Sequence, residues 1–236
     1  MKRILSIILA VLLIASLAAC GNGQKTETTA KSDATTSKAD DTATQAEAAQ
    51  QGAKTSTDKN ILILYFSADN TKDVDAVSTA TPMPNGESSV KWIADIIHDE
   101  VGGDIEPIIP SKDYPLEYNA VADAAKAEVD NNERPAYEPL SVDPTQYKTI
   151  FIGYPIWWYT LPMVLETFFD TYDLSGVTIV PFNTHAGSRD GNTYNMIRER
   201  EPNANVIDGI AIAGSDAGTD SAKTQVVEWV KKLPLE

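Results

Sequence analysis

Five short apolar runs, each followed by a longer amphipathic segment, constrain what this chain can fold into. The runs cover residues 61–66, 105–109, 149–152, 177–182 and 206–212. Most are continuous rather than alternating, which is typical of strands that are buried on both faces of a parallel sheet. The amphipathic segments predict helices over residues 88–101, 117–131, 162–172, 192–200 and 220–232. This alternation predicts an α/β fold with a doubly wound, five-stranded parallel sheet in the order 2-1-3-4-5.

The first twenty residues predict where the protein works. Lys2 and Arg3 precede an apolar stretch over residues 4–16, and small residues lead up to Cys20. The pattern resembles a bacterial lipoprotein signal, with residues 1–19 removed and Cys20 lipid-modified; the alternative is a secretory signal with a chance cysteine. Cys20 is the only cysteine, so an intrachain disulfide is excluded. We therefore expect the protein to be lipid-anchored on the extracytoplasmic face of the bacterial cell membrane.

Residues 20–59 and 60–236 differ sharply in composition. After Cys20, residues up to 59 contain no aromatic side chain and no Ile, Leu or Val. Such a segment buries too little apolar surface to offset the entropy of ordering it, which predicts a disordered tether. Residues 60–236 are long enough for one domain with a sizeable core.

The acidic charge limits the classes of partner. The formal net charge is −15 at pH 7, and it falls on residues 60–236 because the leader and tether are nearly balanced. Nucleic acid is excluded as a partner, since binding to phosphates needs clustered Lys and Arg. Acidity instead provides solubility, repulsion from anionic lipid, or steering toward a basic redox partner.

Ligand-binding side chains are expected after the first, third and fourth strands, where the carboxyl ends of a doubly wound sheet bind ligands. Residues 67–72 have short polar side chains that can cradle a phosphate, or simply form a turn. Residues 154–159 include adjacent tryptophans, which can stack on a planar ring or cover the sheet end as core. Residues 183–188 can present donors to the polar edge of such a ring.

These three motifs resemble those of flavodoxin-like proteins of anaerobic and gut bacteria, which include membrane lipoproteins. The resemblance implies non-covalent binding of FMN and a role in redox chemistry. It assigns the phosphate to Ser67, Asn70 and Thr71. It assigns one side of the isoalloxazine to Tyr154, Pro155, Ile156, Trp157 and Trp158, and the other side to Thr184, His185, Gly187 and Ser188.

Two features depart from the family pattern. Asp69 stands where a glycine usually precedes Asn-Thr, which places a carboxylate beside the predicted phosphate site. Residues 73–87 separate that loop from the first helix, so the helix N-terminus does not directly follow the loop. This insertion is either a lid over the cofactor or a surface excursion.

Three classes of function remain. The first is an FMN-dependent electron carrier or reductase, and the second is a lipoprotein of the same fold that binds a different planar or phosphorylated ligand. A hydrolase is disfavoured, because residues 214–218 place Ser215 at the wrong position for a nucleophile elbow. Of the two histidines, His98 is expected on a helix surface, while His185 lies in the third loop, where it can bond a flavin carbonyl or move a proton.

Overall fold

A computed structural model describes residues 60–68, 83, 87–115 and 117–235. The predicted signal peptide, Cys20 and the tether lie outside these residues, as do Asn70, Thr71 and nearly all of the predicted insertion. No helix among the described residues is long and apolar enough to cross a membrane.

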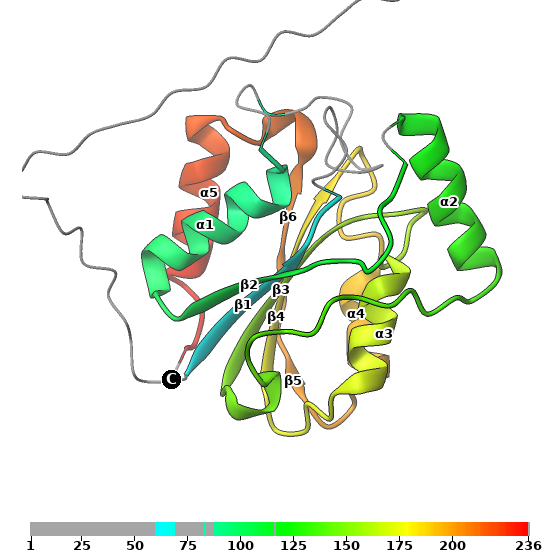
Figure 1. Cartoon of the computed structure of the whole chain (residues 1–236). Coiled ribbons are helices and arrows are strands. Elements are labelled where there is room, and N and C mark those ends of the chain that lie inside the picture. The colour runs from blue at the N-terminus through cyan, green and yellow to red at the C-terminus, as the bar shows by residue number, and fades with distance from the viewer. Residues whose placement is uncertain (1–59, 69–82, 84–86, 116, 236) are drawn as a thin grey trace, which may run out of the picture. The chain divides into compact units, whose positions relative to one another are not determined.

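The chain forms one parallel sheet in the order β2-β1-β3-β4-β5, which confirms the predicted topology (Figure 1). The strands are β1 Ile61–Phe66, β2 Asp104–Ile108, β3 Thr149–Pro155, β4 Thr178–His185, β5 Asn205–Val206 and β6 Ile210–Ala213. The last two both pair with β4, and all strand pairs are parallel.

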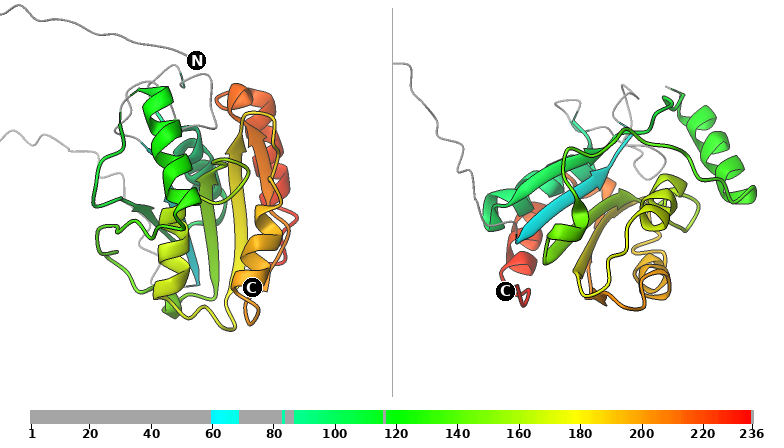
Figure 2. Two further views of the ribbon diagram at one scale, coloured as in Figure 1. Left: turned by 90° about the vertical axis from the view of Figure 1, so that its right-hand side faces the viewer. Right: turned by 60° about the horizontal axis from the view of Figure 1, so that its bottom comes forward.

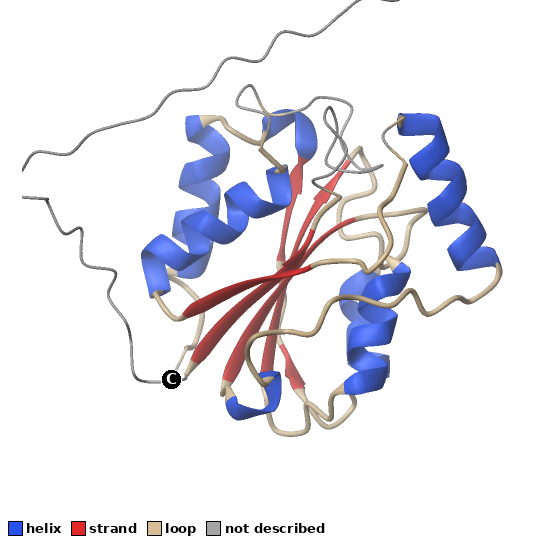
Figure 3. Ribbon diagram, viewed as in Figure 1, coloured by secondary structure: helices blue, strands red, loops and turns tan. Residues whose placement is uncertain are grey.

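Helices cover both faces of this sheet (Figure 3). The helices are α1 Ser89–Val101, α2 Tyr118–Asp130, α3 Met163–Thr171, α4 Thr193–Arg200 and α5 Asp220–Val230, with short 3-10 turns at Pro144–Gln146 and Gly214–Asp216. Helices α1 and α5 bury Ile63 and Tyr65 of β1 on one face, while Leu62, Leu64 and Phe66 pack on the opposite face with residues of α2, α3 and α4. Burial on both faces explains why the strands are continuous apolar runs.

The predicted last strand, residues 206–212, is interrupted in the structure. Val206 pairs with Ile179 of β4, and Ile210 pairs with Phe182 of β4. The segment from Val206 to Ile210 therefore contains one residue more than the segment of β4 that it pairs with. Gly209 lies so close to β4 that a Cβ atom there would meet the carbonyl oxygen of Pro181 at 2.0 Å. Pro181 has no N–H to donate, which favours a break in the ladder at this point.

The two central strands extend further than predicted, to Pro155 in β3 and His185 in β4. Their close pairing depends on Gly153, because a Cβ atom there would meet the ring of Phe182 at 2.1 Å. Several residues that the sequence places in ligand-binding loops therefore belong to strands: Tyr154, Pro155, Asn183, Thr184 and His185.

Candidate functional site

A two-residue turn at the carboxyl end of β3 presents two aromatic rings. Trp157 and Thr160 exchange backbone hydrogen bonds of 3.2 and 3.0 Å, so Trp158 and Tyr159 form the turn between them. Both have positive φ, at 52° and 62°. That pattern is typical of a type I′ turn, where Asn and Gly are preferred. Bulky side chains in this conformation carry strain of about 1 kcal/mol or more each, and such strain clusters at functional sites.

The rings of this turn are exposed beside α2. Trp158 is 44% exposed and Tyr159 is 72% exposed. The indole Nε1–H of Trp158 donates to the carbonyl oxygen of Ala122 at 2.9 Å, and Lys126 Nζ lies 5.8 Å from the ring centroid. Helix α2 thus fixes the position of Trp158 while leaving much of its ring accessible.

The turn, α2 and the loop after β4 border an open pocket of about 630 Å³, which we call the aromatic pocket. Figures 1 and 2 show α2 beside the carboxyl ends of the central strands. The residues that line the pocket are Tyr118, Asn119, Ala122, Asp123, Ile156, Trp158, Tyr159, Ala186, Gly187 and Ser188. Four of the predicted flavin contacts are therefore brought together here, namely Ile156, Trp158, Gly187 and Ser188.

Other predicted contacts lie in the core instead. The hydroxyl of Tyr154 is hydrogen-bonded to Thr193 Oγ1 at 2.9 Å, and Tyr154 and Thr184 are fully buried. Trp157 is 1% exposed and makes edge-on contacts with Phe66 and Tyr114, whose ring centroids lie 5.2 and 5.0 Å away. The interpretation as core packing therefore applies to Trp157, whereas its neighbour Trp158 lines the pocket. Pro155 is buried in β3 and lines none of the described pockets.

Trp157 leaves one polar atom unsatisfied. Its Nε1–H is buried and has no hydrogen-bond partner among the described residues. A buried donor without an acceptor costs about 1–3 kcal/mol. This donor sits directly before the strained turn, at the end of β3 where the fold places ligands.

His185 ends β4 and turns away from the aromatic pocket. The backbone N–H of Gly187 donates to His185 Nδ1 at 3.0 Å, which assigns the ring proton to Nε2. Burial, followed by the positive charge of Arg189, lowers the pKa of His185 below its usual value, which favours the neutral ring. It lines a separate pocket between the loop after β4 and α5.

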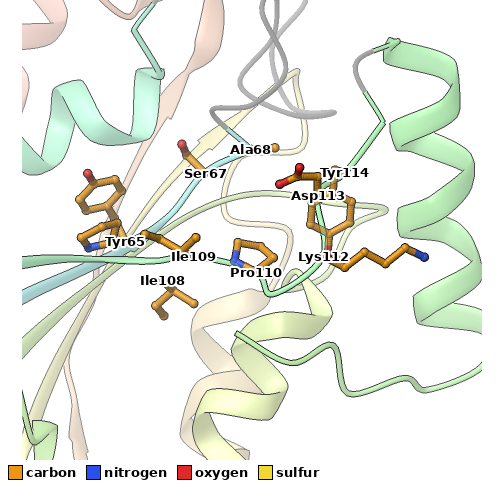
Figure 4. Close-up of a pocket in the computed structure, with 10 residues that line it drawn as sticks. Tyr65, Ser67, Ala68, Ile108, Ile109, Pro110, Lys112, Asp113 and Tyr114 are labelled. Carbon is orange, nitrogen blue, oxygen red and sulfur yellow. The ribbon is translucent and has the colours of Figure 1, made fainter. Parts of the chain in front are cut away.

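Ser67, the one described member of the predicted phosphate-binding set, follows β1. It borders a pocket of about 250 Å³ at the carboxyl ends of β1 and β2. Figure 4 shows Tyr65 and Ser67 at one end of this pocket and Lys112, Asp113 and Tyr114 at the other. Asn70 and Thr71 lie outside the described residues, so their assignment to a phosphate remains a prediction.

The structure adds residues that the sequence analysis did not assign to a site. Tyr159 directly follows the tryptophans, so its aromatic side chain was an available signal. Tyr118 and Asn119 reach the pocket from α2, and Arg189 reaches the pocket beside His185. No local pattern marks these three, because they belong to elements whose approach depends on the packing of the whole domain.

A family model described as Flavodoxin matches residues 60–233. The chain belongs to this flavodoxin family. The match covers the whole described fold from β1 to α5 and ends shortly before the C-terminus. A comparison with curated proteins gave no match.

Solved structures agree with this membership. A protein from Bacteroides eggerthii, provisionally named a flavoprotein, is 28% identical, with a TM-score of 0.58 over 76% of this chain and 100% of its own. A similarly named protein from Bacteroides uniformis is 26% identical, with a TM-score of 0.57 over 73% of this chain and 98% of its own. A Lactobacillus acidophilus flavoprotein, solved in complex with FMN, shares the fold at 22% identity and a TM-score of 0.51, over 67% of this chain and 96% of its own.

Proposed function

We propose that this member of the flavodoxin family binds FMN in the aromatic pocket and acts in electron transfer or flavin-dependent reduction. The observation that carries the proposal is the strained turn of Trp158 and Tyr159, which holds two exposed rings at the carboxyl edge of the sheet. Strain is retained where it serves a ligand, and a flat aromatic surface suits a planar ring system. Family membership and the FMN complex of the Lactobacillus acidophilus flavoprotein support the choice of ligand.

The residues of the aromatic pocket fit such a group. A volume of about 630 Å³ lies within the range of about 300–1,000 Å³ that is common for ligand sites. Part of its lining is aromatic, and another part is the loop from Ala186 to Ser188, which can offer hydrogen-bonding groups to the edge of the ring. FMN, when bound, supplies one- or two-electron chemistry. The protein's part is to bury one face of the ring, exclude water and orient its edge.

The phosphate contacts of the proposal rest on the loop after β1. Ser67 lies at the end of this strand, and Asn70 and Thr71 are proposed to complete the cradle. Asp69 would disfavour a dianion unless its carboxylate is occupied by nearby backbone N–H groups. The phosphate is therefore expected to contribute less here than in a loop that has glycine at that position.

The proposal is tested by identifying the cofactor of full-length protein purified without denaturation. We expect about one FMN per chain, visible from its flavin absorbance and released on denaturation. Protein stripped of cofactor should quench the fluorescence of added FMN. It should bind riboflavin more weakly than FMN, because riboflavin lacks the phosphate and charge-assisted hydrogen bonds to a phosphate contribute about 1.5–3 kcal/mol each. Protein that changes the fluorescence of neither compound would contradict the flavin proposal and favour a different planar or phosphorylated ligand.

We also propose that lipid on Cys20 holds the domain at the extracytoplasmic face of the membrane, where it meets a redox partner with a basic surface. Cys20→Ala should release the protein from the membrane fraction or leave it unprocessed, without changing cofactor content. Ser16→Ala, upstream of the predicted cleavage site, serves as the control. Normal processing and an unaltered membrane fraction in Cys20→Ala would point to a different anchor.

A further inference from the structure

A second pocket lies on the other side of the loop that borders the aromatic pocket. Its volume is about 390 Å³, and we call it the polar pocket. It lies between the end of β6, the start of α5 and the loop after β4. The residues that line it are His185, Gly187, Arg189, Ala211, Ile212, Ala213, Asp216, Ala222 and Gln225. Gly187 is the one described residue that lines both pockets, so the loop after β4 lies between them.

His185 presents one ring N–H to the polar pocket. Its side chain is 9% exposed, and Nδ1 is occupied by the backbone N–H of Gly187. Nε2–H is therefore the polar atom that His185 leaves for a ligand; no described residue accepts a hydrogen bond from it, and it is not among the fully buried atoms without a partner, so it is accessible from the pocket. An anion in the pocket would accept a charge-assisted hydrogen bond from this N–H, which is stronger than a hydrogen bond between neutral groups.

Arg189 supplies the positive charge. It is exposed, and its guanidinium makes no hydrogen bond or ion pair with another described residue. The side-chain amide of Asn183 donates to the carbonyl oxygen of Arg189 at 3.0 Å, which fixes the backbone of this residue at a φ of 57°. Most arginines of an acidic domain find a carboxylate, as Arg198 does with Asp208 and Arg200 with Asp170 and Glu166. Arg189 therefore leaves its guanidinium available to pair with an anion in this pocket.

The remaining walls restrict the ligand further. Ala211, Ile212, Ala213 and Ala222 give the pocket an apolar side, which suits an organic body rather than a bare inorganic ion. Asp216 places one carboxylate at the same pocket, which disfavours a second negative charge on the ligand. Gln225 adds an amide that can donate or accept a hydrogen bond.

We propose that the polar pocket binds the carboxylate of a small organic acid with a single negative charge, which pairs with Arg189 and accepts a hydrogen bond from His185 Nε2. Asp216 and Gln225 then face the uncharged part of the ligand. The inference goes beyond the proposed function and does not depend on it, because it is argued from described residues of the polar pocket and not from the aromatic pocket. If FMN binds as proposed, Gly187 would separate the acid from the cofactor.

The two histidines of the chain make a direct test possible. Full-length, FMN-free protein labelled at histidine should give two sets of ring signals, assigned with His98→Gln. We expect benzoate to shift the His185 signals saturably and to raise the pKa of His185, since a bound anion opposes the lowering effects of burial and Arg189 and adds to those of Asp190 and Asp216. His98 in α1 should not respond. Benzamide, which has the same shape without the charge, should give no saturable shift.

Variants connect this response to the residues. Arg189→Gln should weaken benzoate binding about tenfold or more, because it removes a charge-assisted hydrogen bond. Arg198→Gln is the matched control and should bind benzoate normally. The unchanged His98 signals report that each variant is folded.

Three results would overturn the inference: no shift of His185 with benzoate up to about 50 mM, an equal shift with benzamide, or unaltered affinity in Arg189→Gln. Tighter saturable binding of inorganic phosphate than of benzoate would overturn the assignment to a carboxylate. Loss of FMN binding alone would leave the inference standing, since the test is made on FMN-free protein.

Discussion

Trp157 and Trp158 are adjacent in sequence and lie in opposite surroundings. Trp157 packs against Phe66 and Tyr114 in the core, whereas Trp158 lines the aromatic pocket with nearly half of its surface exposed. The change happens because the chain turns at Trp158, whose positive φ redirects the backbone. A pair of tryptophans is thus divided between the core and the lining of the aromatic pocket.

This division predicts different effects of the two residues on cofactor binding. Trp158→Ala should weaken FMN affinity by about 1 kcal/mol or more, through lost stacking and burial. Trp157→Phe keeps an aromatic ring in the core and should leave FMN affinity unchanged. Fluorescence titration of stripped protein measures both, with Trp229→Phe on α5 as a control for loss of an indole elsewhere. Equal affinity in Trp158→Ala and the wild type would return Trp158 to a packing role.

Glu128 of α2 is a second residue whose surroundings determine its chemistry. Tyr114 donates a hydrogen bond from its hydroxyl to Glu128 Oε2 at 3.0 Å, next to the contact of Tyr114 with Trp157. Burial raises the pKa of Glu128 from 4.5 to about 7, against the opposing effect of that hydrogen bond. The carboxyl is therefore partly protonated near neutral pH in the folded protein.

The raised pKa has a defined consequence for stability. Between about pH 4.5 and pH 7 the folded state binds more protons at Glu128 than the unfolded state, so this group's contribution to stability falls as pH rises through that window. Glu128→Gln should therefore stabilise the protein at pH 8 relative to the wild type, on the order of 1 kcal/mol after allowance for partial exposure. Urea unfolding at pH 5 and pH 8 measures the change, with Glu138→Gln as the exposed control. An equal effect at both pH values would contradict the assignment.

Among the elements, the turn after β3 most directly connects structure with function. Two bulky residues occupy positions where a type I′ turn prefers Asn and Gly, so the element gives up local stability to present rings. Hydrogen bonds between Trp157 and Thr160 hold the turn closed in spite of that cost.

The cost of this turn can be separated from its function with two substitutions at Tyr159. Tyr159→Gly should raise the free energy of unfolding by up to about 1 kcal/mol, because glycine adopts positive φ without a steric penalty. Tyr159→Ala removes the same ring but retains the strain, so it should show no such gain. Both should weaken FMN binding to a similar extent. If Tyr159→Gly is less stable than Tyr159→Ala, the turn is not strained.

At the scale of the whole molecule, the large negative net charge is the main electrostatic feature. The chain carries −15 at pH 7, and Asp123 places one carboxylate at the aromatic pocket itself. Negative charge near a flavin opposes the gain of electrons, and charges several Å apart interact by about 1 kcal/mol or more at protein-like dielectric. More distant surface charges are screened by salt.

We therefore expect the two-electron reduction potential of bound FMN to lie below that of free FMN and to rise as salt is added. Asp123→Asn should raise the potential, whereas Asp99→Asn, on α1, should change it little. Spectroelectrochemistry at low and high ionic strength measures these shifts. A potential at or above that of free FMN at low salt would contradict the electrostatic argument.

The sequence alone determined the architecture of the domain. Continuous apolar runs and amphipathic segments predicted the five α-helices and the first four strands, because burial on both faces shows directly in the residue pattern. The order of the sheet followed from the doubly wound topology that this alternation favours. The sequence also indicated which loops meet at one edge of the sheet, since the carboxyl ends of parallel strands lie at the same edge. The resemblance at these loops predicted the family, which the match over residues 60–233 confirms.

Only the tertiary structure decided how the side chains at that edge are divided. Trp157 is buried by Phe66 and Tyr114, which come from distant parts of the chain. The break before β6 depends on the close approach of Gly209 to Pro181. The polar pocket likewise joins the loop after β4 to β6 and α5. Periodicity records whether a residue is buried, whereas the neighbours that bury it are selected by packing between elements far apart in sequence, and that packing leaves no local pattern.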